Sequence, residues 1–350
     1  AGDHRRDRDI DDLSPAGIQA QLAWDEELLA ALGKIDRTRI SRANQVDAAM
    51  LASSLRGDIW SLTQFRRREW DPLLYNELAG GAIYNLMARE YAPLADRLKA
   101  ASARLAKLGT LYEVARANLD VARVPPIYAE QAKSRNPGVL SLIDEFIKPN
   151  VDKLDGADRA ALEAAIAQAQ RAVAEQQRWI EGTLLPNARG DFRVGEKLFD
   201  AELAFALLSP LDRAEIRRRA EAELKRVREE MYGVARQVLA GRPGAPALPE
   251  QPTPEEQQKA IAAALALAAA ERPPRDKVVD FARDSLQRAT EFVRARNLVS
   301  VPDDPIDIII MPEFQRGFSV AYCDPPGPLD VGQKTFFAIS PIPDDWDQKK

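Results

Sequence analysis

Histidine and cysteine are almost absent from this chain of 350 residues, which contains one of each, His4 and Cys323. Zinc sites are built from Cys, His and carboxylate side chains, and catalytic ones usually include at least one His. A single His in a charged N-terminal segment therefore excludes an ordinary zinc site made by this chain alone, and it excludes a Ser-His-Asp or Cys-His arrangement. One Cys also excludes an intrachain disulfide, so cysteine usage does not indicate the redox compartment.

Long apolar runs and an excess of one charge are also missing. No run of 18 or more apolar residues occurs, so we expect no membrane span. The 49 basic and 54 acidic residues are interspersed and give a formal net charge of −5. Because nucleic-acid binding needs a basic stripe or patch, we expect no nucleic-acid partner. The chain opens with Ala1 rather than Met, which indicates a processed start, and no signal peptide is present in what remains.

Helix-forming residues dominate the first 298 positions. The composition is 45% hydrophobic and 29% charged, with many Ala, Leu, Arg and Glu residues, which favours helix. From residue 92 to residue 108, apolar residues recur every three or four positions, as on one face of an amphipathic helix. By similar periodicity and start signals, further helices are expected at about residues 14–32, 41–55, 157–180, 209–238, from 253, and 274–298.

The domain organisation follows from two polar or flexible stretches. Residues 1–12 are a polar tail that we expect to be poorly ordered, with His4 inert. Residues 13–298 then form one helical domain. Within it, residues 241–252 are rich in Pro and Gly and could mark a domain boundary. We favour a surface loop between two helices of one bundle, because a capping box at Thr253 starts a helix immediately afterwards.

The pattern changes over residues 299–350. Three short apolar runs at 306–311, 317–322 and 335–340 are bounded by Pro and Gly, as is typical of strands. We therefore predict a mainly helical fold, a multi-helix bundle with a small β-sheet near its C-terminal end. Residues 343–350 begin with a helix start signal and then stop, so we expect that helix to continue beyond residue 350.

Four motifs, taken in this order, resemble the N-terminal portion of the bacterial domain-of-unknown-function 885 family, whose members look like zinc metallopeptidases of the gluzincin type. The resemblance covers nearly the whole chain, and its last motif is the most specific. At Ala220 the chain departs from the pattern, where Gly is expected. The motifs are LLYNEL at 73–78, RVGEKLF at 193–199, AEAELKRV at 220–227 with Met231, and PEFQRGF at 312–318 followed by Tyr322 and PPGPLD at 325–330.

This resemblance implies a zincin-like helical fold that cups a zinc ion. The metal motif of the family is HExxPGH-like and lies on a helix that soon follows the strand resembling 335–340. Two His one helical turn apart hold the metal, and the Glu between them activates water. None of these residues is present here. Zinc is therefore expected to be bound by a C-terminal segment of the same protein, either covalently continuous or present as a separate chain.

The resemblance also implies where a peptide substrate lies. In gluzincin-type sites an extended peptide pairs with an edge strand beside the metal helix. Residues 335–340 are the candidate for this strand, with Phe336, Phe337 and Ala338 as substrate-binding residues; the alternative is an interior strand of the sheet. Tyr322 could donate to an oxyanion, or its hydroxyl could simply be satisfied at a strand end. Arg316 could bind a peptide carboxylate, or form a salt bridge within the chain.

Several Glu residues in the 209–238 helix could suggest paired carboxylates for acid–base chemistry or a metal pair. The basic residues interleaved with them favour the simpler interpretation of a solvated, ion-paired helix face. A di-iron bundle would also need His three residues after Glu, and no such His exists. We therefore predict no catalytic residue within this chain.

We expect this chain to be the N-terminal, substrate-cleft-forming segment of a zinc-dependent peptidase whose HExxH helix lies beyond residue 350. By itself it should be inactive, since the metal ligands are missing. The alternative is a non-catalytic helical scaffold, or a peptide- or protein-binding module that docks partners on its sheet edge. The processed start and the resemblance to exported relatives indicate a periplasmic or secreted protein, with the cytoplasm as the alternative.

Overall fold

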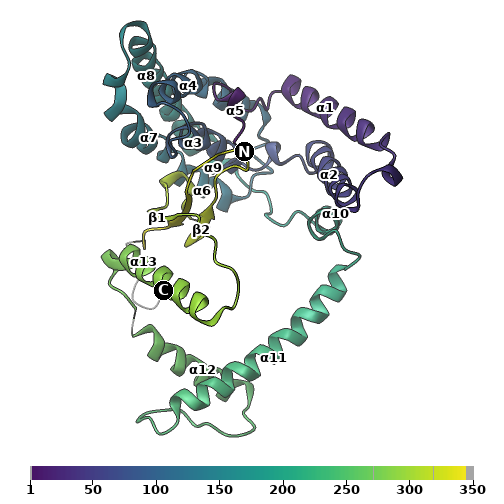
Figure 1. The fold of residues 1–350 in the computed structure, drawn as a ribbon, viewed down its shortest axis with the longest axis vertical. Helices are drawn as coiled ribbons and strands as arrows, with labels where there is room; N and C mark the ends of the chain where they lie inside the picture. The colour runs from purple at the N-terminus through teal and green to yellow at the C-terminus, as the bar shows by residue number, and fades with distance from the viewer. Residues whose placement is uncertain (1, 271, 318, 344–350) are drawn as a thin grey trace. The chain divides into compact units, whose positions relative to one another are not determined.

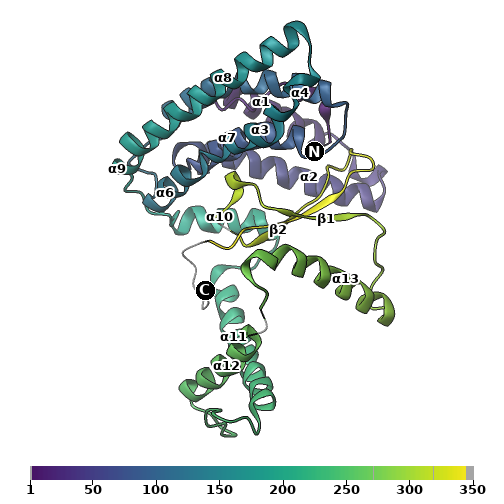
Figure 2. The same cartoon turned by 90° about the vertical axis from the view of Figure 1, so that its left-hand side faces the viewer.

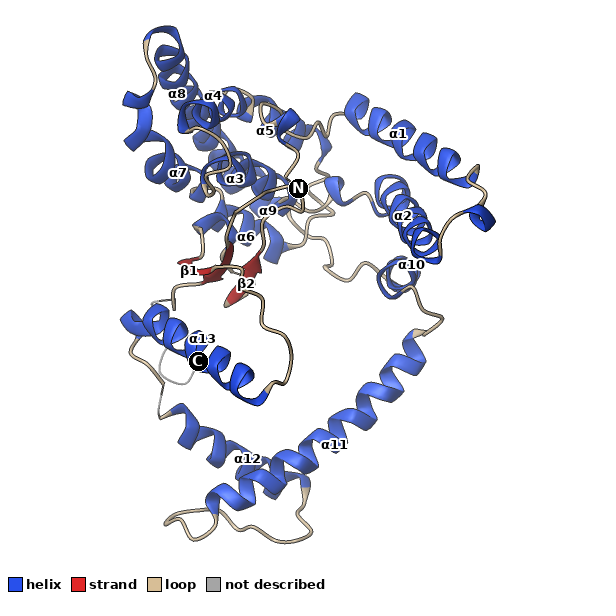
Figure 3. Ribbon diagram, in the orientation of Figure 1, coloured by secondary structure: helices blue, strands red, loops and turns tan. Residues whose placement is uncertain are grey.

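The computed structural model describes residues 2–270, 272–317 and 319–343, and its fold is mainly helical with one small sheet (Figures 1 and 3). The predicted fold class is confirmed. Most of the helix start predicted at 343–350 lies outside the described residues. The helices are α1 Pro15–Gly33, α2 Arg42–Trp60, α3 Leu73–Met87, α4 Leu94–Leu105, α5 Leu108–Asn118, α6 Pro126–Arg135, α7 Gly138–Leu142, α8 Gly156–Trp179, α9 Leu185–Asn187, α10 Glu196–Leu207, α11 Arg213–Leu239, α12 Pro254–Ala269 and α13 Val278–Arg296.

The chain divides into two compact units. Unit 1 comprises residues 1–198 and 282–350, and unit 2 comprises residues 199–281. Across the described residues, none of the helices is both long enough and apolar enough to traverse a bilayer.

The core of unit 1 is an assembly of short helices around α3. The helix α8 packs along α4 and α5 and also contacts α7 (Figure 2). Leu98, Leu105, Leu108 and Leu162 are completely buried at the contacts between these helices. Each such side chain stabilises the fold by about 1.5–3 kcal/mol relative to an exposed position.

The segment predicted as one helix over residues 92–108 is two helices. Helix α4 ends at Leu105 and α5 begins at Leu108. The backbone N–H of Lys107 bonds the carbonyl of Arg104 at 2.9 Å, which tightens the last turn and turns the chain. The periodicity could not reveal this break, because Leu105 and Leu108 are both buried and keep the helical spacing across it.

The first two helices begin as their sequences predict. The side chains of Ser14 and Ser41 accept hydrogen bonds from Gly17 N and Asn44 N, so each serine is an N-cap. An aromatic cluster follows α2: Phe65 lies 5.3 Å from Trp60 and 5.2 Å from Trp70, measured between ring centroids. Nearby, Tyr75 is 2% exposed and donates its hydroxyl hydrogen to Arg68 O at 2.8 Å, so this member of the cluster is a core residue.

The sheet of unit 1 has three described strands, β1 Ile306–Ile310, β2 Ala321–Asp324 and β3 Thr335–Ile339. Their spatial order is β1-β3-β2. Strands β1 and β3 are parallel, with Ile308 opposite Phe337, and β2 runs antiparallel to β3, with Cys323 opposite the same Phe337. The predicted strands at 306–311 and 335–340 are confirmed, whereas the one at 317–322 is displaced and begins at Ala321.

Unit 2 contains a helical hairpin in which α12 packs against α11. Its core includes Tyr232, Leu239 and Ile261. The Pro- and Gly-rich residues 241–252 connect the two helices, and the hydroxyl of Tyr232 donates to Pro249 O in this connection at 2.6 Å. The predicted capping box is present, since Thr253 and Glu256 exchange side-chain and backbone hydrogen bonds.

Candidate functional site

The strand proposed to pair with a peptide lies in the middle of the sheet. Residues Thr335–Ile339 have β1 on one side and β2 on the other, so their backbone groups are paired within the protein. The prediction that residues 335–340 form an edge strand is therefore wrong, and the interior-strand alternative is confirmed. Composition and periodicity identify a strand, but they carry little information on strand order when long loops connect the strands.

The three residues proposed on this strand do not share one face. Successive side chains of a strand point to opposite faces, so Phe336 and Ala338 lie on one face and Phe337 on the other. Ala338 is completely buried. The guanidinium carbon of Arg89 lies 4.5 Å from the centre of the Phe336 ring, a cation–π contact. Phe336 and Phe337 are both partly exposed, each on its own face of the sheet.

Tyr322, on β2, has its hydroxyl hydrogen-bonded to the side-chain oxygen of Gln315. Burial of the ring, together with the negative charge of Asp324, raises the pKa of Tyr322 to about 12. The hydroxyl therefore stays protonated at neutral pH and remains a donor. Because its hydroxyl has a partner within the chain, Tyr322 agrees with the alternative of a tyrosine packed at a strand end with its hydroxyl satisfied.

Arg316 follows a short 3₁₀ turn, Glu313–Gln315, and folds back on the chain. Its Nε donates to the carbonyl of Met311 at 2.9 Å. Its own carbonyl accepts from Nε of Arg135 at 2.7 Å, and Arg135 also bonds Gln315 O at 3.1 Å. Arg316 is therefore engaged with backbone atoms, rather than with the carboxylate that either interpretation of the sequence supposed.

Phe314 anchors the most specific motif to the helices. Its side chain is 2% exposed and lies against α3, where a methyl group added at Gly80 would come within 2.6 Å of ring atom Cε2 and closer still to others. A methyl group added at Gly138 of α7 would lie 2.6 Å from the backbone nitrogen of Phe314. Glycine at these two positions therefore permits the close approach of the motif to both helices. Glu313 adds a hydrogen bond of 2.5 Å from Ser141.

A cluster of polar side chains joins the sheet to the end of α3. The sequence did not predict this cluster. The hydroxyl of Tyr84 donates to Oδ2 of Asp324 at 3.2 Å, and Nη2 of Arg89 lies 3.2 Å from the same oxygen. Arg89 also donates to the backbone carbonyl of Asp324 at 2.7 Å. Burial, and next the charge of Asp324, raise the pKa of Tyr84, so this phenol is neutral. Nothing local in the sequence signals this pair, because Tyr84 and Asp324 lie 240 residues apart.

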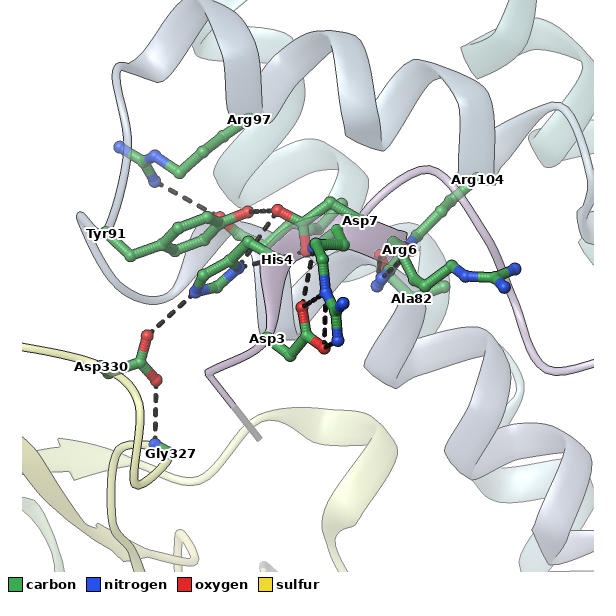
Figure 4. A network of polar contacts seen from close by, with 12 residues as sticks. Asp3, His4, Arg6, Asp7, Ala82, Tyr91, Arg97, Arg104, Gly327 and Asp330 are labelled. Atoms are coloured by element: carbon green, nitrogen blue, oxygen red, sulfur yellow. Dashed lines mark hydrogen bonds and ion pairs between the residues drawn. The ribbon is translucent and has the colours of Figure 1, made fainter.

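The tail and His4 make contacts that the sequence did not indicate. Residues 4–6 form a 3₁₀ turn, and the side chain of Lys107 binds Arg8 O and Asp9 Oδ1, each at 2.8 Å. Figure 4 shows His4 between Tyr91 and Asp330, with Asp7 beside it. The tail therefore packs on the helices of unit 1, because its alternating charges find partners that only the fold brings near.

The carboxylates of α11 are ion-paired as the simpler interpretation predicted. Glu221 accepts from Arg217 at 2.8 Å, and Arg226 pairs with both Glu223 and Glu230. Over the described ranges, no three or more His, Cys, Asp or Glu side chains are grouped so that they could hold a metal ion.

The comparisons place this arrangement in a known group. A solved structure of a proposed lipoprotein of unknown function from Shewanella oneidensis superposes with a TM-score of 0.72 and 24% sequence identity, covering 99% of this chain and 62% of that chain. This chain thus spans less than two thirds of the length of that relative, and the likeness establishes the fold alone. Comparison with curated proteins gave no match. The model of the family described as "Bacterial protein of unknown function (DUF885)" matches residues 1–349, so the chain belongs to the DUF885 family.

Proposed function

We propose that this chain is the N-terminal, substrate-cleft-forming segment of a zinc-dependent peptidase, and that the metal-binding HExxH helix lies beyond residue 350. The observation that carries the proposal is the match to the DUF885 family over residues 1–349. The resemblance of the four sequence motifs to gluzincin-type members of that family supplies the activity that we propose. The length of the Shewanella protein supports it, because 38% of that chain lies outside the part covered by this one. Such a relative therefore contains a further segment that this chain does not cover.

The described residues do not fit the role of zinc ligands. They contain no suitable group of His, Cys and carboxylate side chains, and the one His stacks on Tyr91 and bonds two carboxylates. We therefore assign no metal ligand, general base or catalytic step to this part of the protein. Its proposed contribution is to bind and orient the peptide.

We place the peptide along the outer edge of β1. Met311 N donates to Ile339 O, and Thr335 N donates to Pro305 O, so the odd-numbered residues of this segment bond β3. In a parallel ladder the alternate residues then direct their backbone groups to the other side, and these are Ile306, Ile308 and Ile310. An extended peptide can add to such an edge through backbone hydrogen bonds. Half-exposed Ile306 and Ile310 border the same edge.

Of the substrate-binding residues predicted from the sequence, Phe337 stays the candidate for a side-chain contact with the peptide. Phe337 and Tyr322 are both partly exposed, and each belongs to a strand of this sheet. Phe337 lies opposite Ile308 of β1, so its ring shares one face of the sheet with Ile308, one strand away from the proposed peptide. Tyr322 keeps a protonated hydroxyl bonded to Gln315, but β2 lies at the opposite edge of the sheet from β1, so we assign it no contact with a peptide on β1.

The experiment compares the complete natural protein with the 350-residue chain on a mixed peptide library, with and without a zinc chelator. The proposal expects chelator-sensitive hydrolysis by the complete protein and none by the chain alone. In the complete protein, Ile310→Pro removes one outward N–H from an edge strand, which such strands tolerate. We expect it to raise KM with little change in kcat, whereas the control Ile310→Val retains the N–H and should behave as wild type.

Three results would contradict the proposal: hydrolysis by the chain alone, no hydrolysis by the complete protein, or an unchanged KM in Ile310→Pro. An unchanged KM in Ile310→Pro would contradict only the placement of the peptide on β1. The first two would remove the proposed division of the site between two segments.

A non-catalytic helical scaffold or binding module remains the second candidate function. It is favoured by an apolar groove of about 790 Å³ in unit 2, between α11 and α12. Met231, Val234 and Leu265 line this groove and are 38%, 58% and 57% exposed. Exposed apolar surface of this kind often marks an interaction site. A complete protein that binds no zinc and hydrolyses nothing would favour this function.

We also propose a location outside the cytoplasm. The Shewanella protein of similar fold is a proposed lipoprotein, which supports this location. Fractionation of cells that express the complete protein from its own gene tests the proposal. Recovery in the periplasm, the membrane fraction or the medium would support it, and recovery with cytoplasmic markers would contradict it.

A further inference from the structure

His4 lies flat on a tyrosine and between two carboxylates. Its ring is stacked on Tyr91, with centroids 3.6 Å apart and planes inclined by 8°. Its Nδ1 is 3.1 and 3.2 Å from the two oxygens of Asp7, and its Nε2 is 2.9 Å from Oδ1 of Asp330 (Figure 4). The two carboxylates come from positions 323 residues apart in the chain, one in the tail and one between β2 and β3.

This geometry needs both ring nitrogens to carry a hydrogen. An ionised carboxylate only accepts hydrogen bonds, and a neutral imidazole has a single N–H, so only the imidazolium can donate to both partners. The second oxygen of each carboxylate is also in use. Asp7 Oδ2 accepts from the hydroxyl of Tyr91 at 2.6 Å, and Asp330 Oδ2 accepts from Gly327 N at 2.9 Å. Each of the two carboxylates thus accepts hydrogen bonds on both of its oxygens.

Asp330 organises the β2–β3 loop, which comprises residues 325–334. Besides the bond from Gly327 N to its side chain, its own N–H bonds Gly327 O at 2.9 Å and closes a turn. The tail follows this turn closely, since a methyl group added at Gly2 would lie 2.7 Å from Asp330 N. Toward the end of the loop, Arg89 donates to Lys334 O at 3.4 Å and Gln333 donates to Glu90 O at 3.5 Å, so both longer bonds join the loop to the connection between α3 and α4. The contact between Asp330 and His4 is therefore the short connection between the middle of the loop and the tail.

The surroundings of the imidazole favour its charged form. Burial lowers the pKa of His4, but the hydrogen bonds with Asp330 and Asp7 outweigh it, so the net pKa is raised above its usual 6.5. His4 in turn lowers the pKa of Asp330, which stays ionised in weak acid. The charged and titratable groups around the ring are Asp3, Arg5, Arg6 and Asp7 of the tail, Tyr91, Arg97 and Arg104 of the helical side, and Asp330 with Arg89 on the loop side.

A base with a raised pKa stabilises the folded contact fully below its unfolded pKa, and that stabilisation is lost as pH rises through the raised value. The carboxylate of Asp330, with its lowered pKa, contributes above pH 3.8 and loses its contribution only as pH falls through its own lowered value. The ion pair is thus present in weak acid and weakens as pH rises through the raised pKa of His4. No other histidine in this chain can produce the same dependence.

We propose that His4 is a proton-controlled tie that holds the β2–β3 loop against the helices of unit 1. With two N–H groups it bridges Asp7 and Asp330; when it loses a proton it can donate to only one of them, and the loop is released. The tie is independent of the proposed peptidase activity, because it joins residues of this chain alone. The attachment of the loop beside β3 therefore depends on the surrounding pH.

Hydrogen exchange of the loop tests this proposal in the 350-residue chain. The exchange rates of amides in residues 325–334 are measured at pH 5.5 and pH 8.5 and divided by the intrinsic rate at each pH. We expect protection to be about two- to fivefold greater at pH 5.5, the size that one partly exposed ion pair supplies. His4→Gln keeps one donor but cannot be protonated, so its loop should show equal, low protection at both values.

Two further variants separate the tie from general effects of the tail. Asp330→Asn removes the charged acceptor, so it should abolish the pH difference and lower the pKa of His4, read from the single imidazole signal by NMR. Arg5→Gln alters an exposed ion pair with Asp3 and should leave the pH difference unchanged. Equal protection at both pH values in the wild type, or a pH difference that persists in His4→Gln, would overturn the proposal. An NMR pKa of His4 at or below 6.5 would do the same.

Discussion

The sharpest prediction concerns the docking of Phe314 on two glycines. Removing a buried Phe side chain costs about 3–5 kcal/mol of stability, so Phe314→Ala should destabilise unit 1 by this amount. Gly80→Ala should also destabilise, although alanine within a helix is normally about 1 kcal/mol more favourable than glycine. The reason is that the added methyl group would overlap the ring of Phe314. Overpacking of this kind costs about 1–3 kcal/mol.

The two glycines respond differently when Phe314 is shortened. At Gly80 the obstacle is the ring, which Phe314→Ala removes, so Gly80→Ala should cost little or even stabilise in that background. At Gly138 the obstacle is the backbone nitrogen of Phe314, which remains, so Gly138→Ala should be equally costly in both backgrounds. The first pair should therefore show a coupling energy of at least about 1 kcal/mol, and the second a coupling near zero.

Urea unfolding followed by tryptophan fluorescence measures these energies. None of the five Trp residues falls within residues 199–281, so the signal reports unit 1. Additive effects of Gly80→Ala and Phe314→Ala would refute the close packing described here. The same conclusion would follow if Gly138→Ala were rescued as well as Gly80→Ala.

Three further changes test separate contacts. Tyr84→Phe removes the hydrogen bond to Asp324 and should cost about 0.5–1.5 kcal/mol in the same unfolding assay, with the sheet still formed; no loss would mean that this hydrogen bond does not stabilise unit 1. Leu239→Ala should destabilise unit 2 by about 2–5 kcal/mol, measured by the loss of helical circular dichroism during unfolding. The tryptophan transition of unit 1 should not change, and a shift of that transition would argue against two separate units. Thr253→Ala removes an N-cap and should cost about 1 kcal/mol in unit 2, whereas Thr253→Ser should be nearly neutral; equal losses in both would exclude capping as the cause.

Much of the fold could be predicted from local pattern. Residues 306–310 and 335–339 are β-branched and aromatic runs between Pro and Gly, and both are strands. The start of α2 after Ser41 and of α12 after Thr253 followed from capping residues, whose hydrogen bonds involve only the next few positions. Signals of this kind survive because their physical cause is local in the chain.

The features that could not be predicted depend on distant partners. The order β1-β3-β2 is decided by how the loops return the chain, and no residue of 335–339 indicates whether it has one neighbour or two. The Tyr84–Asp324 bond joins positions 240 residues apart, and the His4–Asp330 bond joins positions 326 residues apart. Single polar residues of this kind carry no periodic signal, which is why His4 was expected to be inert.

The central claim is that this chain supplies the cleft of a zinc peptidase and that another segment supplies the metal site. Zinc analysis of the complete natural protein, with the intact mass determined on the same sample, tests this most directly. The account predicts a polypeptide longer than 350 residues that retains about one zinc per molecule, while the 350-residue chain retains none. Absence of stoichiometric zinc from the complete protein, or stoichiometric zinc on the 350-residue chain, would contradict it.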